Sequence, residues 1–184
     1  MQSRIHRRIM SSQCFRMHRL AGIGLCLSVL VMDPIAAGGA EQDPNGFYGI
    51  RWGTRLADVA DLVRVESADR IQSYELKNGP PLLGDAKVDV LRFIAIEGEL
   101  ARVSIRYSGT HTHTRILAYF ESHYGAFDRT PGSMMRGLNQ QFTWRGPETE
   151  VNLTYESYRE RGNVFVESRT LAPRFNDVLP EHGY

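Results

Sequence analysis

Apolar and polar residues alternate with a period of two along residues 63–109 and 141–168, which is the spacing of half-buried β-strands. The cleanest alternation sets Ala101, Val103, Ile105 and Tyr107 on one face and Arg102, Ser104 and Arg106 on the other. The preceding Glu97-Gly98-Glu99 predicts a hairpin turn. Further strands are expected at residues 47–54, 63–65, 71–76, 88–96, 141–144, 151–155 and 164–168.

Two segments instead show the spacing of amphipathic helices. The first is expected to begin at Thr54, whose hydroxyl suits an N-cap, and to end near Leu62. The second covers roughly residues 113–124, and Gly125 follows it at the position where glycine ends many helices. One apolar face of this second helix comprises Ile116, Leu117, Phe120 and Tyr124.

The expected element order is therefore β-α-β-β-β-α-β-β-β. Runs of strands follow each helix without βαβ alternation, which favours an α+β fold with an antiparallel sheet and two helices packed on one face. This domain is expected to span residues 47–172, after a linker at residues 41–46 and before a poorly ordered tail at residues 173–184.

The segment before the domain has the pattern of a secretory signal peptide. Residues 1–19 are basic, residues 20–32 are apolar, and a helix breaker and small residues lead to Ala40, after which we expect cleavage. Thirteen apolar residues span about 20 Å as a helix, less than the roughly 30 Å of a bilayer core. The alternative is an uncleaved signal anchor. Either way, the basic flank places the rest outside the cytoplasm, in the periplasm or secreted.

Composition narrows the function classes. With 42% hydrophobic residues, 23% charged residues and a formal net charge of +1, the chain is typical of a folded globule. Both cysteines, Cys14 and Cys26, lie before Ala40, so a cleaved chain has no disulfide, thiol nucleophile or cysteine-ligated metal. Acidic residues outnumber basic ones after residue 40, and this balance argues against a nucleic-acid partner.

Residues 47–59, FYGIRWGTRLADV, resemble the opening motif of small, uncharacterised bacterial secreted proteins. Looser collinear matches extend the resemblance over most of residues 47–170. It implies an α+β module of lipoprotein or inhibitor type in the cell envelope, and it implies no catalytic residues. Physically the motif is expected to be a folding device, because Gly49 and Gly53 allow positive φ while Trp52 is placed to cover the first helix. The alternative for the motif is a binding role.

Candidate chemistry is sparse. His111 and His113 resemble part of a metal site, because an extended backbone would place both imidazoles on one side, although a zinc site needs further ligands. The other interpretation is two solvated residues at a helix start. The sequence has no Gly-x-Ser-x-Gly, no His-Glu-x-x-His and no phosphate-binding glycine loop before a lysine, so neither a catalytic residue nor a cofactor is expected.

Three residues are candidates for interaction. Arg102 and Arg106 share a strand face and have the chemistry to clamp a carboxylate or phosphate, and Tyr158 breaks the parity of its strand. The alternative for the arginines is an ion-paired, solvated surface. The sequence predicts a non-enzymatic binding module of the cell envelope, whose partner is an envelope protein or small ligand. Its alternatives are a signal-anchored membrane subunit and a metal-binding protein that uses His111 and His113.

Overall fold

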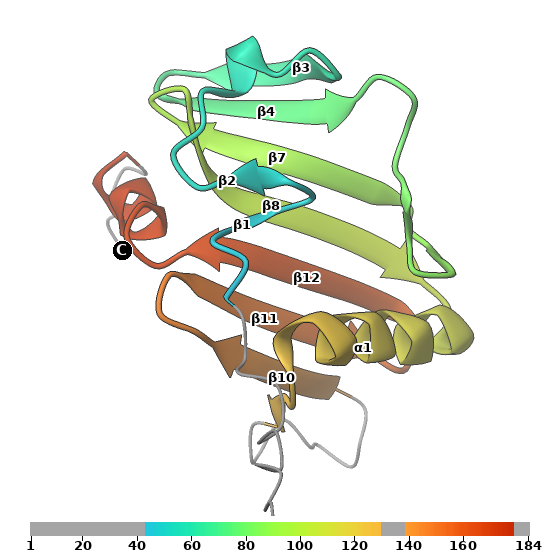
Figure 1. The fold of residues 1–184 in the computed structure, drawn as a ribbon. Helices are drawn as coiled ribbons and strands as arrows, with labels where there is room; N and C mark the ends of the chain where they lie inside the picture. Colours follow the sequence, from blue (N-terminus) through green and yellow to red (C-terminus); the bar gives the residue numbers. More distant parts are fainter. Residues whose placement is uncertain (1–42, 130–138, 179–184) are drawn as a thin grey trace, which may run out of the picture. The chain divides into compact units, whose positions relative to one another are not determined.

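A computed structural model describes residues 43–129 and 139–178, which fold around one antiparallel sheet (Figure 1). Its strand order is β3-β4-β7-β8-β12-β11-β10-β9. These strands are β3 (Leu62–Ala68), β4 (Ile71–Leu76), β7 (Val90–Ile96), β8 (Glu99–Ser108), β9 (Asp128–Arg129), β10 (Asn139–Arg145), β11 (Thr149–Glu156) and β12 (Arg161–Ser168). Two small hairpins pair β1 (Gly46–Phe47) with β2 (Ile50–Arg51) and β5 (Leu82–Leu83) with β6 (Ala86–Lys87).

The sheet consists of two antiparallel meanders that meet where β8 pairs with β12. The first contains β3, β4, β7 and β8, and the second contains β9 to β12. Every neighbouring pair is antiparallel, and few helices accompany the sheet. The broad expectation of an α+β fold with an antiparallel sheet therefore fits, although the described residues are mostly β.

The predicted hairpin between β7 and β8 is confirmed. Its two turn residues, Glu97 and Gly98, both have positive φ (53° and 89°). Positive φ at both positions matches the right-handed twist of the flanking strands, so this turn type is favoured in two-residue hairpins. Glu99, expected in the turn, is the first residue of β8.

The two faces of the sheet differ as the alternation predicted. Val103, Ile105 and Tyr107 are at most 1% exposed and belong to the main core, whereas Arg102 and Arg106 point to the opposite face. Ala101 is an exception, because the register shifts beside it and it joins a second cluster with Ile96 and Phe175. We call the face that carries the main core the helix face, and the face that carries Arg102 and Arg106 the outer face.

The prediction of a first α-helix from Thr54 to Leu62 is wrong. This segment contains only a three-residue 3-10 helix, η1 (Leu56–Asp58), and its N-cap residue Arg55 makes no side-chain cap. The backbone is pinned to the sheet, since the amides of Gly53 and Leu56 donate to the carbonyls of Leu100 and Gly98. These backbone amides, which lie where the first turn of a helix was expected, already donate hydrogen bonds to the β7–β8 hairpin. The tertiary contacts therefore override the local helical pattern.

The second predicted helix is confirmed as α1 (Thr110–Tyr124) and begins earlier than expected. Gly125 ends it with a φ of 91°, and its amide donates to the carbonyl of Glu121. The buried side of α1 packs against the helix face and comprises His113, Ile116, Phe120 and Tyr124. Among the described residues, no helix is both long enough and apolar enough to cross a membrane.

Residues 43–46, expected to belong to a linker, are instead fixed against the sheet. The Asp43 carboxylate accepts hydrogen bonds from the amides of Glu148 (2.6 Å), in the β10–β11 connection, and Thr149 (2.8 Å), the first residue of β11. The Trp52 indole, expected to cover the first helix, donates to the Thr149 hydroxyl at 2.9 Å. The predicted signal peptide and cleavage site lie outside the described residues.

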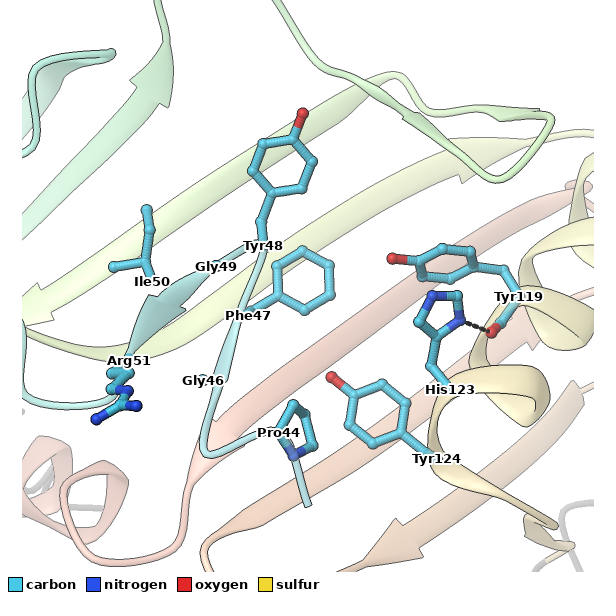
Figure 2. Close-up of a pocket in the computed structure, with 10 residues that line it drawn as sticks. All are labelled: Pro44, Gly46, Phe47, Tyr48, Gly49, Ile50, Arg51, Tyr119, His123 and Tyr124. Atoms are coloured by element: carbon cyan, nitrogen blue, oxygen red, sulfur yellow. Dashed lines mark hydrogen bonds between the residues drawn. The ribbon is translucent and has the colours of Figure 1, made fainter. Parts of the chain in front are cut away.

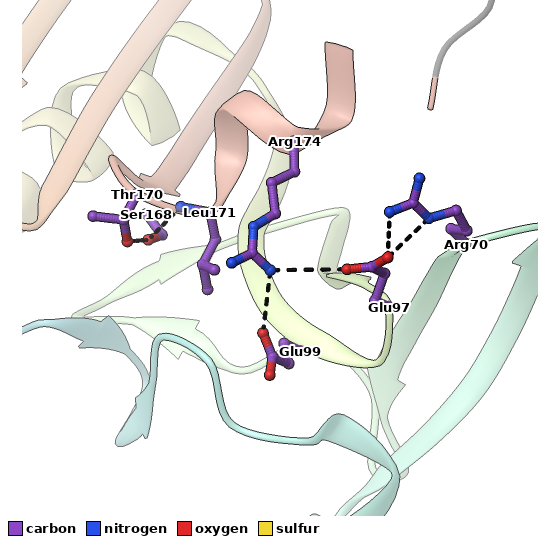
Figure 3. A network of polar contacts seen from close by, with 7 residues as sticks. All are labelled: Arg70, Glu97, Glu99, Ser168, Thr170, Leu171 and Arg174. Carbon is purple, nitrogen blue, oxygen red and sulfur yellow. Dashed lines mark hydrogen bonds and ion pairs between the residues drawn. The ribbon is translucent and has the colours of Figure 1, made fainter. Parts of the chain in front are cut away.

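The C-terminal segment is also ordered where a poorly ordered tail was expected. Residues 172–177 form the 3-10 helix η2 (Ala172–Asp177), and Phe175 is 4% exposed in the outer-face cluster. Figure 3 shows Arg174 of η2 reaching Glu97 and Glu99, at 3.8 and 3.6 Å. These ion pairs are largely exposed, so burial of Phe175 contributes more to holding η2 in place. The last predicted tail residues, 179–184, lie outside the described part of the chain.

Candidate functional site

An aromatic pocket lies between the β1–β2 hairpin and the C-terminal half of α1 (Figure 2). Its volume is about 430 Å³, within the range typical of small-molecule sites. Figure 2 shows Tyr119, His123 and Tyr124 extending from α1 toward the hairpin. The other lining residues are Pro44, Gly46, Phe47, Tyr48, Gly49, Ile50 and Arg51.

The hairpin presents Tyr48 at the edge of the pocket. Tyr48 and Gly49 form its two-residue turn, and both have positive φ (53° and 77°). Glycine adopts this conformation freely, whereas a tyrosine there is strained. Five non-glycine residues of the described chain have positive φ, and Tyr48 is the one aromatic residue among them. Its side chain is nevertheless 52% exposed, so burial does not explain its placement.

Gly46 allows the hairpin to close tightly. A Cβ atom at this position would lie 2.2 Å from the carbonyl oxygen of Ile50, so the two strands leave no room for a side chain. Asp43 fixes the chain just before the hairpin, and Trp52 fixes it just after. The pocket wall that carries Tyr48 is therefore held from both ends.

The helix supplies the opposite wall. The Tyr119 and His123 rings lie one helical turn apart, with centroids 4.2 Å from each other. The His123 Nδ1 atom is 2.7 Å from the backbone oxygen of Tyr119. Because a carbonyl oxygen only accepts, His123 Nδ1 carries a proton and donates it to this oxygen. The imidazole is thus oriented by its own helix.

Buried rings form the base of this wall. Phe47 packs on Phe120 with centroids 6.3 Å apart, and Tyr124 meets both Phe120 (5.7 Å) and Trp144 (5.0 Å). Phe47, Phe120, Tyr124 and Trp144 are each at most 4% exposed. Aromatic contacts of this kind stabilise a fixed geometry beyond the area they bury.

The electrostatics of the pocket keep the phenols of Tyr119 and Tyr124 neutral. Burial raises the pKa of Tyr119, and the neighbouring Tyr48 adds to the effect. Burial also raises the pKa of Tyr124, followed by the influence of Tyr119 and Asp43. Burial works to raise the pKa of Asp43 as well, but hydrogen bonds from Thr149 and other donors outweigh it and lower that pKa overall. The pocket therefore offers aromatic faces with hydroxyl donors.

The two histidines predicted as metal ligands are not brought together. Both lie on α1, so the expected extended backbone is wrong, and residues two apart on a helix point about 200° from each other. His111 is exposed, whereas His113 is 6% exposed. In the described part of the chain, no group of three or more His, Cys, Asp or Glu side chains is placed to hold a metal ion.

His113 has a packing role. Its Nδ1 atom lies 2.8 Å from the Tyr107 hydroxyl, and its ring lies parallel to that of Tyr155 at 4.0 Å. Burial lowers the pKa of His113, and a hydrogen bond with Gln140 offsets only part of this shift. The neutral imidazole is thus part of the core under the N-terminal half of α1.

The predicted interaction residues lie away from the pocket, on or near the outer face. Arg102 pairs with Glu167, its guanidinium lies 4.5 Å from the Phe175 ring centroid, and its Nε atom lacks a well-oriented hydrogen bond. Arg106 is exposed near the end of β8, and Tyr158 is 88% exposed between β11 and β12.

Sequence reasoning did not single out Tyr48, Tyr119 or His123. Residues 47–54 were expected to form one strand, which concealed the Tyr48-Gly49 turn. A signal was present, since a residue followed by glycine between short apolar segments is typical of a two-residue hairpin turn. The spacing of Tyr119 and His123 places them on one side of a helix, but it gives no sign of the hairpin opposite.

Comparison of the chain with family models, with curated proteins and with solved structures finds no match. Its function is therefore inferred from the geometry of the site.

Proposed function

We propose that the protein is exported and acts as a non-enzymatic binding protein whose small ligand occupies the aromatic pocket. Tyr48 carries the proposal. Asparagine, aspartate or glycine would form its turn at lower cost, yet a tyrosine stands there with half of its side chain exposed at the pocket. Backbone strain that serves no packing purpose is typical of functional positions.

The lining of the pocket favours a neutral ligand with both apolar faces and hydroxyl groups. The rings of Phe47, Tyr48 and Tyr119 offer flat apolar surfaces, while phenol hydroxyls and the His123 imidazole offer hydrogen bonds. The described lining includes no carboxylate, and Arg51 is its one permanent charge. A saccharide ring fits this combination, because its C–H faces pack on aromatic rings and its hydroxyls meet the polar groups.

The same lining supports binding rather than turnover. No serine, cysteine or carboxylate is among the lining residues. The Ser122 hydroxyl lies 3.0 Å from His123 Nδ1 but is outside the lining, and it donates to the backbone oxygen of Tyr119. Nucleophilic and general acid–base catalysis usually require a nucleophile or carboxylate that faces the pocket together with the histidine.

Titration with neutral oligosaccharides tests the proposal. We expect saturable binding of N,N′-diacetylchitobiose or cellobiose, followed by NMR or calorimetry. Tyr48→Asn removes the ring and keeps a residue suited to the turn, so affinity should fall at least about tenfold. The matched control is Tyr158→Asn, which alters an exposed tyrosine outside the pocket and should leave affinity unchanged. Failure of the whole panel to bind, or equal binding by Tyr48→Asn, would overturn the ligand assignment.

Export is tested separately, by intact mass of the protein recovered from the producing cell. A chain that begins at Glu41 supports cleavage after Ala40. A full-length chain in the membrane fraction supports the signal-anchor alternative. Full-length protein in the cytosol, with Cys14 and Cys26 retained, contradicts export.

A further inference from the structure

Three arginines of the outer face are paired with acids. Arg92 Nε lies 2.8 Å from Glu75, and Arg145 Nη2 lies 2.8 Å from Glu150. Arg102 is likewise bridged to Glu167 on the neighbouring strand. Such pairing is the expected behaviour of a solvated, charged sheet face.

Two arginines where β8 meets the start of β12 break this rule. Within the described chain, neither Arg106 nor Arg161 makes an ion pair or side-chain hydrogen bond. Arg106 lies opposite Asn163, and Arg161 lies opposite Ser108. Arg106 and Arg161 are therefore diagonal neighbours on one face, a spacing of about 7–8 Å that long side chains can bridge.

These side chains line a groove of about 400 Å³, which we call the arginine groove. Its lining residues include Arg106, Ser108, Arg159, Arg161 and Asn163. All five carry hydrogen-bond donors, and three carry a positive charge.

The two carboxylates that line the groove are each engaged by another lining residue. The Ser108 hydroxyl donates to Asp89 at 2.6 Å, and Glu156 pairs with Arg159 at 3.3 Å. Glu156 also lies opposite Arg161 in the strand register, yet no ion pair joins them. Both Arg106 and Arg161 thus remain available to an external anion.

The strands that carry these arginines are rigidly placed. A Cβ atom at Gly162 would lie 1.9 Å from the Tyr107 ring, so that ring rests directly on the backbone of β12. This contact fixes β12 against β8 at the residue next to Arg161. Binding groups on packed strands lose less entropy than groups on a loop when they meet a ligand.

We infer that the arginine groove binds a phosphate group, held between the guanidinium groups of Arg106 and Arg161. Arginine donates two parallel hydrogen bonds to phosphate oxygens, and two unpaired arginines match the charge of a phosphate dianion. The Asn163 side chain adds a neutral donor beside them, whereas the single hydroxyl hydrogen of Ser108 is donated to Asp89. The phosphate comes either from a soluble phosphorylated molecule or from a lipid headgroup.

Titration of the purified protein with inorganic phosphate at low salt, followed by NMR, tests the inference. We expect saturable shifts in the amides around Ser108 and Asn163. Arg106→Gln and Arg161→Gln should each weaken binding about tenfold or more, because each removes a charge-assisted donor. The control Arg145→Gln removes a charge from the same face at a paired position, and should leave binding unchanged.

Vesicle sedimentation distinguishes the two sources. Phosphatidylcholine vesicles with and without phosphatidic acid serve as probes, with Arg106→Gln and Arg145→Gln as the variants. Arg106-dependent sedimentation with phosphatidic acid indicates a lipid headgroup, whereas binding of inorganic phosphate without sedimentation indicates a soluble ligand. The inference is overturned if neither probe binds, or if Arg145→Gln weakens binding as much as Arg106→Gln. Saccharide binding at the aromatic pocket is independent of these outcomes.

Discussion

The helix face and the outer face of the sheet carry different kinds of residue and are stabilised by different interactions. The helix face is covered by α1 and the β1–β2 hairpin, and its strands present residues such as Phe93, Val103 and Leu153 that are fully buried. Among the residues that the structure describes, the outer face is covered only locally, by η2, and it carries arginine–glutamate pairs. Burial dominates the first face and charge pairing the second.

In the described part of the chain, each face has a place where its own rule fails, and the comparison identifies the two candidate sites. On the helix face, aromatic packing fails at Tyr48, which is strained and half exposed. On the outer face, charge pairing fails at Arg106 and Arg161, which face the arginine groove. A departure from the local rule is informative because the surrounding residues show what the rule is.

The largest expected effect tests whether buried side chains contribute more to stability on the helix face than on the outer face. Phe120→Ala should lower the free energy of unfolding by about 3–5 kcal/mol, because Phe120 is fully buried and contacts four aromatic rings. Phe165→Ala on the outer face should cost about 1 kcal/mol or less, since Phe165 is 38% exposed. Urea denaturation measures both. Equal costs for the two variants would show that the faces do not differ in this way.

The second effect concerns the hydrogen bonds that hold the hairpin on the helix face. Asp43→Ala should cost about 1–3 kcal/mol, because it leaves the amides of Glu148 and Thr149 without their acceptor. Arg145→Ala, which breaks an exposed ion pair, should cost about 0.5 kcal/mol or less. Chemical denaturation at neutral pH compares them, and a cost for Asp43→Ala no greater than for Arg145→Ala would contradict the proposed anchoring.

The alternation of residues 102–107 was sufficient to predict β8 and its two faces, because period-two patterning directly reflects burial on a sheet. Ala101 departs from the pattern because the register shifts beside it. The first helix was mispredicted, since the amides of Gly53 and Leu56 bond to residues more than forty positions away. The pocket could not be predicted from the sequence for the same reason. It is lined by both Tyr48 and Tyr119, and no local pattern encodes that pairing. The alternation placed Arg106 on the face opposite the core, where it is exposed, but its unpaired state depends on strand register. Its role in an interaction stays a prediction.

A third, smaller effect uses pH to probe the helix face. The folded pKa of His113 lies below its ordinary value near 6.5, mainly because the ring is buried among Tyr107, Tyr155 and Gln140. Below that value the unfolded chain binds a proton that the folded chain does not, so stability should fall as the pH drops from about 7 toward the folded pKa. His113→Phe should remove this part of the pH dependence of the melting temperature. His111→Phe changes an exposed histidine on the same helix and should leave it intact; if the two variants behave alike, His113 is not the responsible group.

The smallest expected effect has the opposite sign and tests whether Tyr48 is retained for contact rather than for stability. Tyr48→Asn should raise the free energy of unfolding by about 0.5–1 kcal/mol, because asparagine adopts positive φ more readily than tyrosine and the exposed ring contributes little burial. The comparison is Glu97→Asn, at the equivalent position of the β7–β8 turn, since Glu97 has the same φ of 53° but also binds Arg70 and Arg174. This second variant should therefore gain less stability than Tyr48→Asn in the same denaturation assay. A loss of stability in Tyr48→Asn would mean that the ring stabilises the hairpin, and the strained turn would then have a structural explanation that needs no ligand.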